Sequence, residues 1–238
     1  MARFCTLILV GWKFMNPRLP YLTATIHIHH MANQAYSMIK SVAYAAQNAY
    51  DDDEFMKIPL QKEFPNADKD KLSELVKLQT EITLDDSIYC AQATGLIFTH
   101  SGLEKCIEEI IEFDSSQHPE EWVHFIENKK VSLKSIIEKS KDDIIKDYIS
   151  DFTKNLKKES LLKKIDILLS IFKPNDGTMG DYKFDKEKIQ HIDNLRHQYA
   201  HGKTGEPKID ETFSSIEYLI KTGDYFLSLM SEKYDVYT

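Results

Sequence analysis

Residues 185–202 of this chain read DKEKIQHIDNLRHQYAHG and carry a complete helix signal. Asp185 can cap the start of a helix, because its side chain accepts hydrogen bonds from the first backbone N–H groups. Gly202 stands where a helix commonly ends. Between them apolar residues recur at a spacing that places them on one helix face, which predicts a helix packed against a core. They are Ile189, Ile192, Leu195 and Tyr199.

The same apolar spacing recurs on both sides of this helix. Only 8 glycines and 7 prolines interrupt 238 residues, so the segments between turns are long. Strand-like alternation of useful length and internal repeats are both absent from the sequence, and proline-containing connections are expected at 55–68 and 173–184. The fold class predicted is all-α, as a bundle of long helices. The helices are expected at about residues 32–50, 68–79, 85–114, 119–127, 131–156, 159–172, 185–202 and from 210 onward.

Composition is that of an ordinary globular protein, with 42% apolar and 29% charged residues. The formal net charge of -8 argues against a protein that coats nucleic acid generally. The charge is uneven, however: residues 51–128 hold 19 acids and 6 lysines, whereas residues 129–164 hold 11 lysines and 6 acids. The second stretch predicts either a local basic surface that attracts an anionic partner or a solvated helix face.

The three cysteines, Cys5, Cys90 and Cys106, are scattered and suggest neither a disulfide framework nor a zinc ribbon. A reducing compartment, the cytoplasm, fits this usage best. Cys90 and Cys106 lie on apolar stripes and are expected to be buried. The sequence has no apolar stretch of the ~20 residues that a membrane span needs, so no membrane partner is expected.

Residues 1–30 differ in composition from the rest of the chain. They hold two of the three arginines and the cluster His27-Ile28-His29-His30. Met31 then opens a segment that resembles the remainder. We expect residues 1–30 to be an N-terminal appendage, of the kind that an upstream start codon adds, and residues 31–238 to form a single helical domain.

Arg196 is the only arginine after Arg18 in a chain that otherwise uses lysine. Arginine grips phosphate or carboxylate with a rigid, permanently charged fork, whereas lysine is a point charge. His201 follows five residues later, with His197 between. A histidine can take and return a proton near neutral pH, and a guanidinium can stabilise charge developing on phosphorus. Together they suffice for RNA cleavage by the ribose 2′-OH without metal or cofactor.

The hexad Arg-His-Gln-Tyr-Ala-His at 196–201 resembles the R-x4-H motif of the HEPN superfamily. Its position near a helix end, late in an all-α chain and before one more long helix, also resembles that family. The resemblance implies a HEPN-like bundle over about residues 85–235, which often dimerises with two motifs face to face. It further implies a metal-independent endoribonuclease of a toxin–antitoxin or antiphage system, paired with an antitoxin or another defence partner. Arg196 and His201 are then catalytic and His197 supports them. The lysine-rich stretch 129–164, with Lys203, is expected to guide RNA.

Three other interpretations use the same residues. His197 and His201 have the i, i+4 spacing of two zinc ligands, and His191 is near, but Gln198 replaces the glutamate of H-E-x-x-H. Arg196 could instead pair with a buried carboxylate while the histidines lie at the surface, with Asp193 pairing with His197. Finally, the chain could be a non-catalytic helical interaction or sensor module of a defence system. P-loop and G-x-G-x-x-G motifs are absent from the sequence, so no nucleotide cofactor is expected.

Overall fold

The computed structural model of the chain describes residues 17–50, 57–127, 129–174, 178–179, 182–201 and 209–236. Almost all of these residues lie in helices, and the prediction of an all-α bundle of long helices is confirmed. The elements are α2 (Arg18–Tyr50), α3 (Lys57–Glu63), α4 (Lys69–Gln117), α5 (Pro119–Trp122), the 3-10 helix η1 (Val123–Phe125), α6 (Leu133–Glu138), α7 (Lys141–Leu156), α8 (Leu161–Phe172), β1 (Thr178–Met179), β2 (Tyr182–Lys183), α9 (Lys186–Ala200) and α10 (Ile209–Tyr234).

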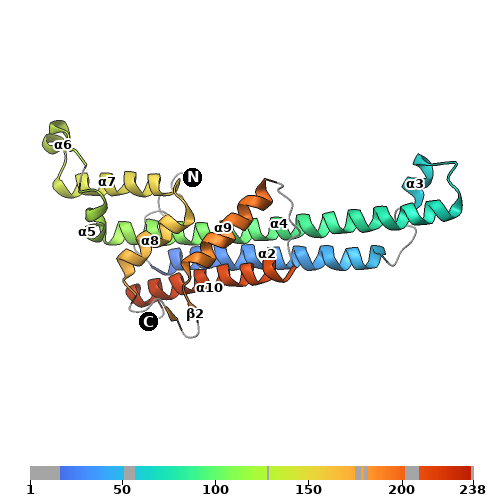
Figure 1. Cartoon of the computed structure of the whole chain (residues 1–238). Helices are drawn as coiled ribbons and strands as arrows, with labels where there is room; N and C mark the ends of the chain where they lie inside the picture. The colour runs from blue at the N-terminus through green and yellow to red at the C-terminus, as the bar shows by residue number, and fades with distance from the viewer. Residues whose placement is uncertain are drawn as a thin grey trace, which may run out of the picture.

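Three long helices, α2, α4 and α10, lie side by side along the molecule and form its core (Figure 1). Helix α8 packs on α4, and α9 packs on both α4 and α8. Helices α6 and α7 lie at one end of the molecule (Figure 1). At the other end α4 extends beyond α10 and carries α3, where three buried apolar residues form a small separate cluster. These are Leu60, Leu72 and Val76.

Small residues allow the three long helices to approach closely. The buried face of α2 repeats every three or four residues, as Ala24, Ile28, Ala32, Ala35 and Ile39, which is the spacing of a coiled-coil seam. Gly95 and Gly102 of α4 and Gly223 of α10 lie opposite this face, and at the last two a Cβ atom would meet backbone or the base of a side chain. A Cβ atom on Gly102 of α4 would come within 2.7 Å of the His27 carbonyl oxygen, and one on Gly223 of α10 within 2.9 Å of Ile28 Cγ1. Glycine is therefore needed at these helix crossings.

Helix α2 starts earlier than the sequence predicted. A helix was expected from about residue 32, and residues 1–30 were expected to be an appendage. Instead α2 begins at Arg18 and runs without interruption through Met31, with Ala24 and Ile28 fully buried. The physical reason is the seam itself, which continues across residue 30 into contacts with Gly102 and Gly223. Residues 18–30 are thus built into the core, while residues 1–16 lie outside the described part of the chain.

Helix α4 joins two helices that the sequence analysis separated. Asp68 caps it as expected, accepting a hydrogen bond from the backbone N–H of Lys71 at 2.9 Å. The expected end near Gln79 and new start at Asp85 or Asp86 are wrong, because no proline or glycine interrupts this stretch and both aspartates are exposed on a continuous helix.

The expected helix 131–156 is in fact two helices. Ser132 caps α6, and Ser140 caps α7 by accepting a hydrogen bond from the backbone N–H of Asp143. Serine is a favourable N-cap residue, so a new helix can begin after Ser132 and again after Ser140. The apolar period alone does not reveal this break. On α6 the side chains of Leu133, Ile136 and Ile137 are exposed, at 79%, 57% and 83%.

Three further differences concern short segments and single side chains. The loop expected at 173–184 contains the small antiparallel pair β1–β2, with Thr178 opposite Lys183. The connection expected at 55–68 contains α3. Cys106 is fully buried as expected, and burial raises the pKa of its thiol. Cys90, expected to be buried, is exposed, because it lies off the buried stripe of α4.

A buried polar cluster ties α10 to the end of α4. Asp114 is fully buried and accepts hydrogen bonds from the Trp122 indole at 2.8 Å, the Lys233 ammonium at 2.6 Å and the Tyr234 hydroxyl at 2.7 Å. Three donors on one carboxylate satisfy its lone pairs inside the core. Among the described residues, none of the helices combines the length and apolar character that crossing a membrane requires.

Candidate functional site

Helix α9 carries the predicted motif and is capped at its N-terminal end. Asp185 caps its start, accepting hydrogen bonds from the backbone N–H groups of Glu187 and Lys188 at 2.9 and 3.1 Å, as predicted. The helix ends at Ala200, and the backbone N–H of His201 donates to the carbonyl groups of the preceding turn. Gly202, the expected C-cap glycine, and Lys203 lie outside the described residues.

The apolar face of α9 packs onto α4 and α10. Ile189, Ile192 and Tyr199 are buried, and Leu195 is half-buried. The Tyr199 ring lies edge-on to Tyr89 of α4, with 5.6 Å between ring centroids, and its hydroxyl lies 3.3 Å from the hydroxyl of Thr212 on α10. The last two turns of α9 therefore have a defined position over the middle of the bundle.

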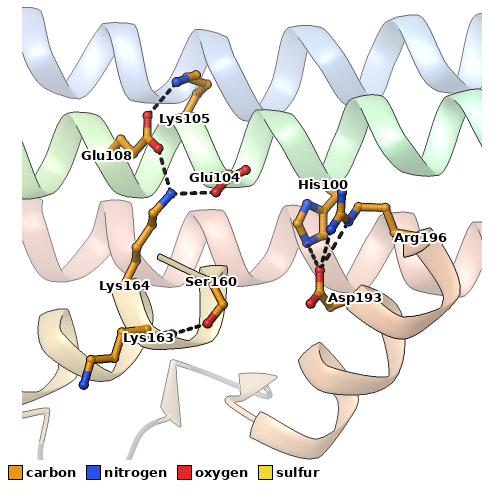
Figure 2. A network of polar contacts seen from close by, with 9 residues as sticks. All are labelled: His100, Glu104, Lys105, Glu108, Ser160, Lys163, Lys164, Asp193 and Arg196. Atoms are coloured by element: carbon orange, nitrogen blue, oxygen red, sulfur yellow. Dashed lines mark hydrogen bonds and ion pairs between the residues drawn. The ribbon is translucent and has the colours of Figure 1, made fainter. Parts of the chain in front are cut away.

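Arg196 lies at the edge of this packed face, and its side chain is 34% exposed. Its Nε and Nη2 atoms both lie 3.2 Å from the same oxygen, Oδ1 of Asp193. His100, on α4, approaches that oxygen from the opposite helix, with its Nε2 atom at 3.1 Å (Figure 2). Arg196 is therefore paired with a carboxylate that a buried histidine also contacts.

The surroundings of Asp193 keep its carboxyl group ionised. The contact with His100 lowers the pKa of Asp193 most, and Arg196 lowers it further, against the opposite effect of partial burial. Asp193 is consequently negative at neutral pH. Asp193 contacts Arg196 and His100 instead of pairing with His197, the partner that the i, i+4 spacing also allowed.

The two motif histidines form a second group. His197 and His201 are both exposed, and their ring centroids are 4.3 Å apart. Within the described chain no hydrogen bond or ion pair connects either histidine to Arg196. A single chain thus brings His197 together with His201, and Arg196 together with Asp193 and His100.

His191 does not join the other histidines to make a metal centre. Its Nε2 atom lies 3.0 Å from Glu211 of α10. Over the described ranges, no group of three or more histidine, cysteine, aspartate or glutamate side chains is arranged to hold a metal ion.

His100 is the residue that sequence reasoning missed. It lies nearly a hundred residues before the motif, and only its place in the apolar pattern of α4, beside buried Leu96 and Leu103, could have drawn attention to it. That apolar pattern does not indicate which residue His100 contacts. The contact with Asp193 exists only because α9 packs across α4.

The lysine-rich stretch 129–164 lies away from the motif. It forms α6, α7 and the start of α8, whereas the C-terminal end of α9 lies over the middle of α4 (Figure 1). Part of its positive charge is balanced locally: Lys157 pairs with Glu112 at 3.0 Å, and Lys164 is fully buried between Glu104 and Glu108. This stretch does not line the motif within one chain.

Comparisons of the chain with models of protein families, with curated proteins and with solved structures found no match. The case for a function therefore rests on the chemistry of the site.

Proposed function

We propose that this protein is a metal-independent endoribonuclease of the HEPN type, which cleaves RNA by attack of the ribose 2′-OH. One observation carries the proposal. The end of α9 displays two exposed histidines in ring contact, one and five residues after a half-buried arginine that a carboxylate holds in place. This combination supplies a proton acceptor, a proton donor and a fixed positive charge, which is what the reaction requires.

In this mechanism His201 removes the proton from the 2′-OH or donates one to the leaving 5′-oxygen, and His197 assists or orients it. Arg196 stabilises the charge on the pentacoordinate phosphorus. Asp193 occupies the Nε and Nη2 edge of the guanidinium, and within the described chain Nη1 makes no hydrogen bond. Arg196 can therefore offer N–H groups to a phosphate without releasing Asp193.

The proposed site is completed by a second copy of the chain. On an ideal helix Arg196 and His201 point about 140° apart, and within the described chain no hydrogen bond or ion pair joins them. Two copies with their motifs face to face, as the HEPN resemblance implies, can bring an arginine and a histidine to the same phosphate. The proposal includes a cytoplasmic role in a toxin–antitoxin or antiphage system, with an antitoxin or defence protein as partner.

The direct test is RNA cleavage in EDTA by the wild type, Arg196→Ala and His201→Ala. We expect products with cyclic phosphate and 5′-hydroxyl ends, and a loss of about 100-fold or more in each variant. His191→Ala is the matched control, because it removes an exposed histidine from the same helix and should leave the rate unchanged. A well-folded wild type that cleaves none of several RNAs, alone or with its partner, would contradict the proposal.

One observation favours a second candidate, a non-catalytic helical interaction module. Helix α6 exposes Leu133, Ile136 and Ile137, an apolar group that a solvated helix face does not normally carry. For this candidate, Ile137→Asp should abolish binding of a stoichiometric protein partner while His201→Ala changes nothing. The reverse pattern supports the enzyme.

A further inference from the structure

His100 has an environment that calls for an explanation. Its side chain is only 4% exposed, on a helix whose neighbouring positions are apolar. Its Nε2 atom is shielded from solvent and makes no well-aligned hydrogen bond in the described chain. The polar atom it approaches is Asp193 Oδ1, at 3.1 Å (Figure 2). Because buried polar groups are normally satisfied, a histidine here needs a role that compensates for its burial.

The contact with His100 distinguishes the Asp193–Arg196 pair from exposed ion pairs of the same spacing. Two i, i+3 pairs of this chain that lie in solvent are loose: Lys71 lies 3.9 Å from Asp68, Lys154 lies 3.6 Å from Asp151, and all four side chains are at least 62% exposed. Such pairs contribute little to stability or order. Asp193 and Arg196 are 27% and 34% exposed, lie 3.2 Å apart, and are backed by a group from a second helix.

We propose that His100 is a positioning residue for the candidate site, acting on Arg196 through Asp193. His100 is fixed by the packing of α4, so it sets where the Asp193 carboxylate lies. The carboxylate in turn fixes the Nε and Nη2 edge of Arg196 and leaves the remaining N–H groups aimed for a phosphate. The catalytic part of this inference rests on the proposed function. The positional part, that His100 orders Arg196, does not.

The kinetic test compares two substitutions of His100 in the full-length chain. His100→Leu removes the polar contact at similar volume, and His100→Gln retains an N–H donor. We expect His100→Leu to lower kcat for RNA cleavage in EDTA by about 10- to 100-fold with KM within about 2-fold, because displacing a catalytic group weakens transition-state contacts. His100→Gln should restore most of kcat. Thr99→Val, at a fully buried neighbour whose hydroxyl bonds only to the Gly95 carbonyl, is the control for core damage.

The positional test needs no RNA. The chain has only three arginines, so Arg196→Lys assigns the Arg196 Nε–Hε signal in a ¹⁵N NMR spectrum. We expect this signal to be sharp and protected from exchange in the wild type and His100→Gln. It should broaden or exchange rapidly in His100→Leu and in Asp193→Asn.

An unchanged Arg196 signal in a folded His100→Leu variant overturns the inference. So does an increase in kcat, which would mean that His100 and Asp193 restrain Arg196 rather than position it. If His100→Leu does not fold, Asp193→Asn decides in its place, and a sharp, protected Arg196 signal there overturns the inference equally. If the wild type cleaves no RNA, the proposed function fails, while the NMR comparison still decides whether His100 orders Arg196.

Discussion

At the scale of single residues, Asp193 connects the two helices of the candidate site. It lies on α9, receives Arg196 from its own helix, and touches His100 from α4. These contacts lower the pKa of Asp193, so the ionised form of its carboxyl group is more favoured in the folded protein than in the unfolded chain. The charge of this one residue therefore contributes both to stability and to the placement of Arg196.

We predict a pH-dependent cost for Asp193→Asn. At pH 7 the variant should lose about 1.5 kcal/mol of unfolding free energy, because a charged hydrogen-bond acceptor is removed. A carboxyl group with a lowered folded pKa contributes stability above the unfolded pKa of about 3.9, and this is lost as pH falls through the folded pKa. The difference in unfolding free energy between the wild type and the variant, measured by urea unfolding, should thus shrink below pH 4. Asp151→Asn, an exposed control, should change stability by less than about 0.5 kcal/mol at any pH.

At the scale of elements, buried charge holds α8 against α4. Lys164 of α8 is fully buried, and its ammonium donates to Glu104 at 2.6 Å and to Glu108 at 2.8 Å (Figure 2). Glu108 also accepts from Lys105, and hydrogen bonds from both lysines lower the pKa of Glu108 despite burial. Since α9 packs on both α4 and α8, this network also supports the helix that carries the motif.

Substituting Lys164 tests this network. Lys164→Met keeps most of the volume but removes the buried ammonium that Glu104 and Glu108 share and leaves Glu108 with Lys105 alone, so it should cost about 3–5 kcal/mol in urea unfolding. Lys163→Met is the matched control, because the Lys163 side chain is exposed. This substitution should change the free energy of unfolding by less than about 0.5 kcal/mol. Equal effects of the two substitutions would show that the network does not stabilise the α4–α8 contact.

The glycines of α4 provide a second test of element packing. Gly102→Ala would force a Cβ atom to 2.7 Å from a backbone oxygen of α2, which can move only if the helices separate. We expect a loss of about 1–3 kcal/mol. In Gly95→Ala the new Cβ atom lies 2.8 Å from Cδ1, the flexible end of the Ile39 side chain, which can move aside. The higher helix propensity of alanine offsets the remaining cost of this contact. Thermal unfolding should therefore rank Gly95→Ala above Gly102→Ala in stability, and the opposite order would contradict this account.

At the scale of the whole molecule, residues 18–30 belong to the layer formed by α2, α4 and α10. A chain beginning at Met31 loses the buried Ala24 and Ile28, and with them the His27 backbone that lies against Gly102 and the Ile28 side chain that lies against Gly223. We expect it to unfold at clearly lower urea concentration. Within the full chain Ile28→Ala should cost about 2–5 kcal/mol, and Ile26→Ala, at 59% exposure, less than about 1 kcal/mol. A chain from Met31 as stable as the full chain would instead support the appendage expected from composition.

Local patterns in the sequence were sufficient for part of this description. The helix period indicated the all-α class, Asp68 and Asp185 indicated two helix starts, and the apolar spacing in 189–199 indicated the packed face of α9. These properties depend on residues within a few positions of one another, so propensity and capping determine them.

Only the tertiary structure decided which helices meet and what each motif residue touches. The membership of residues 18–30 in the core, the exposure of α6 and the contact of His100 with Asp193 all depend on packing between segments far apart in the sequence. A buried polar side chain looks the same in the sequence whatever its partner, because burial and pairing are set by the helix that packs over it. The sequence by itself therefore determined the helical class, two helix starts and the motif, and the packing of α9 on α4 determined that a buried histidine and a carboxylate stand behind the arginine.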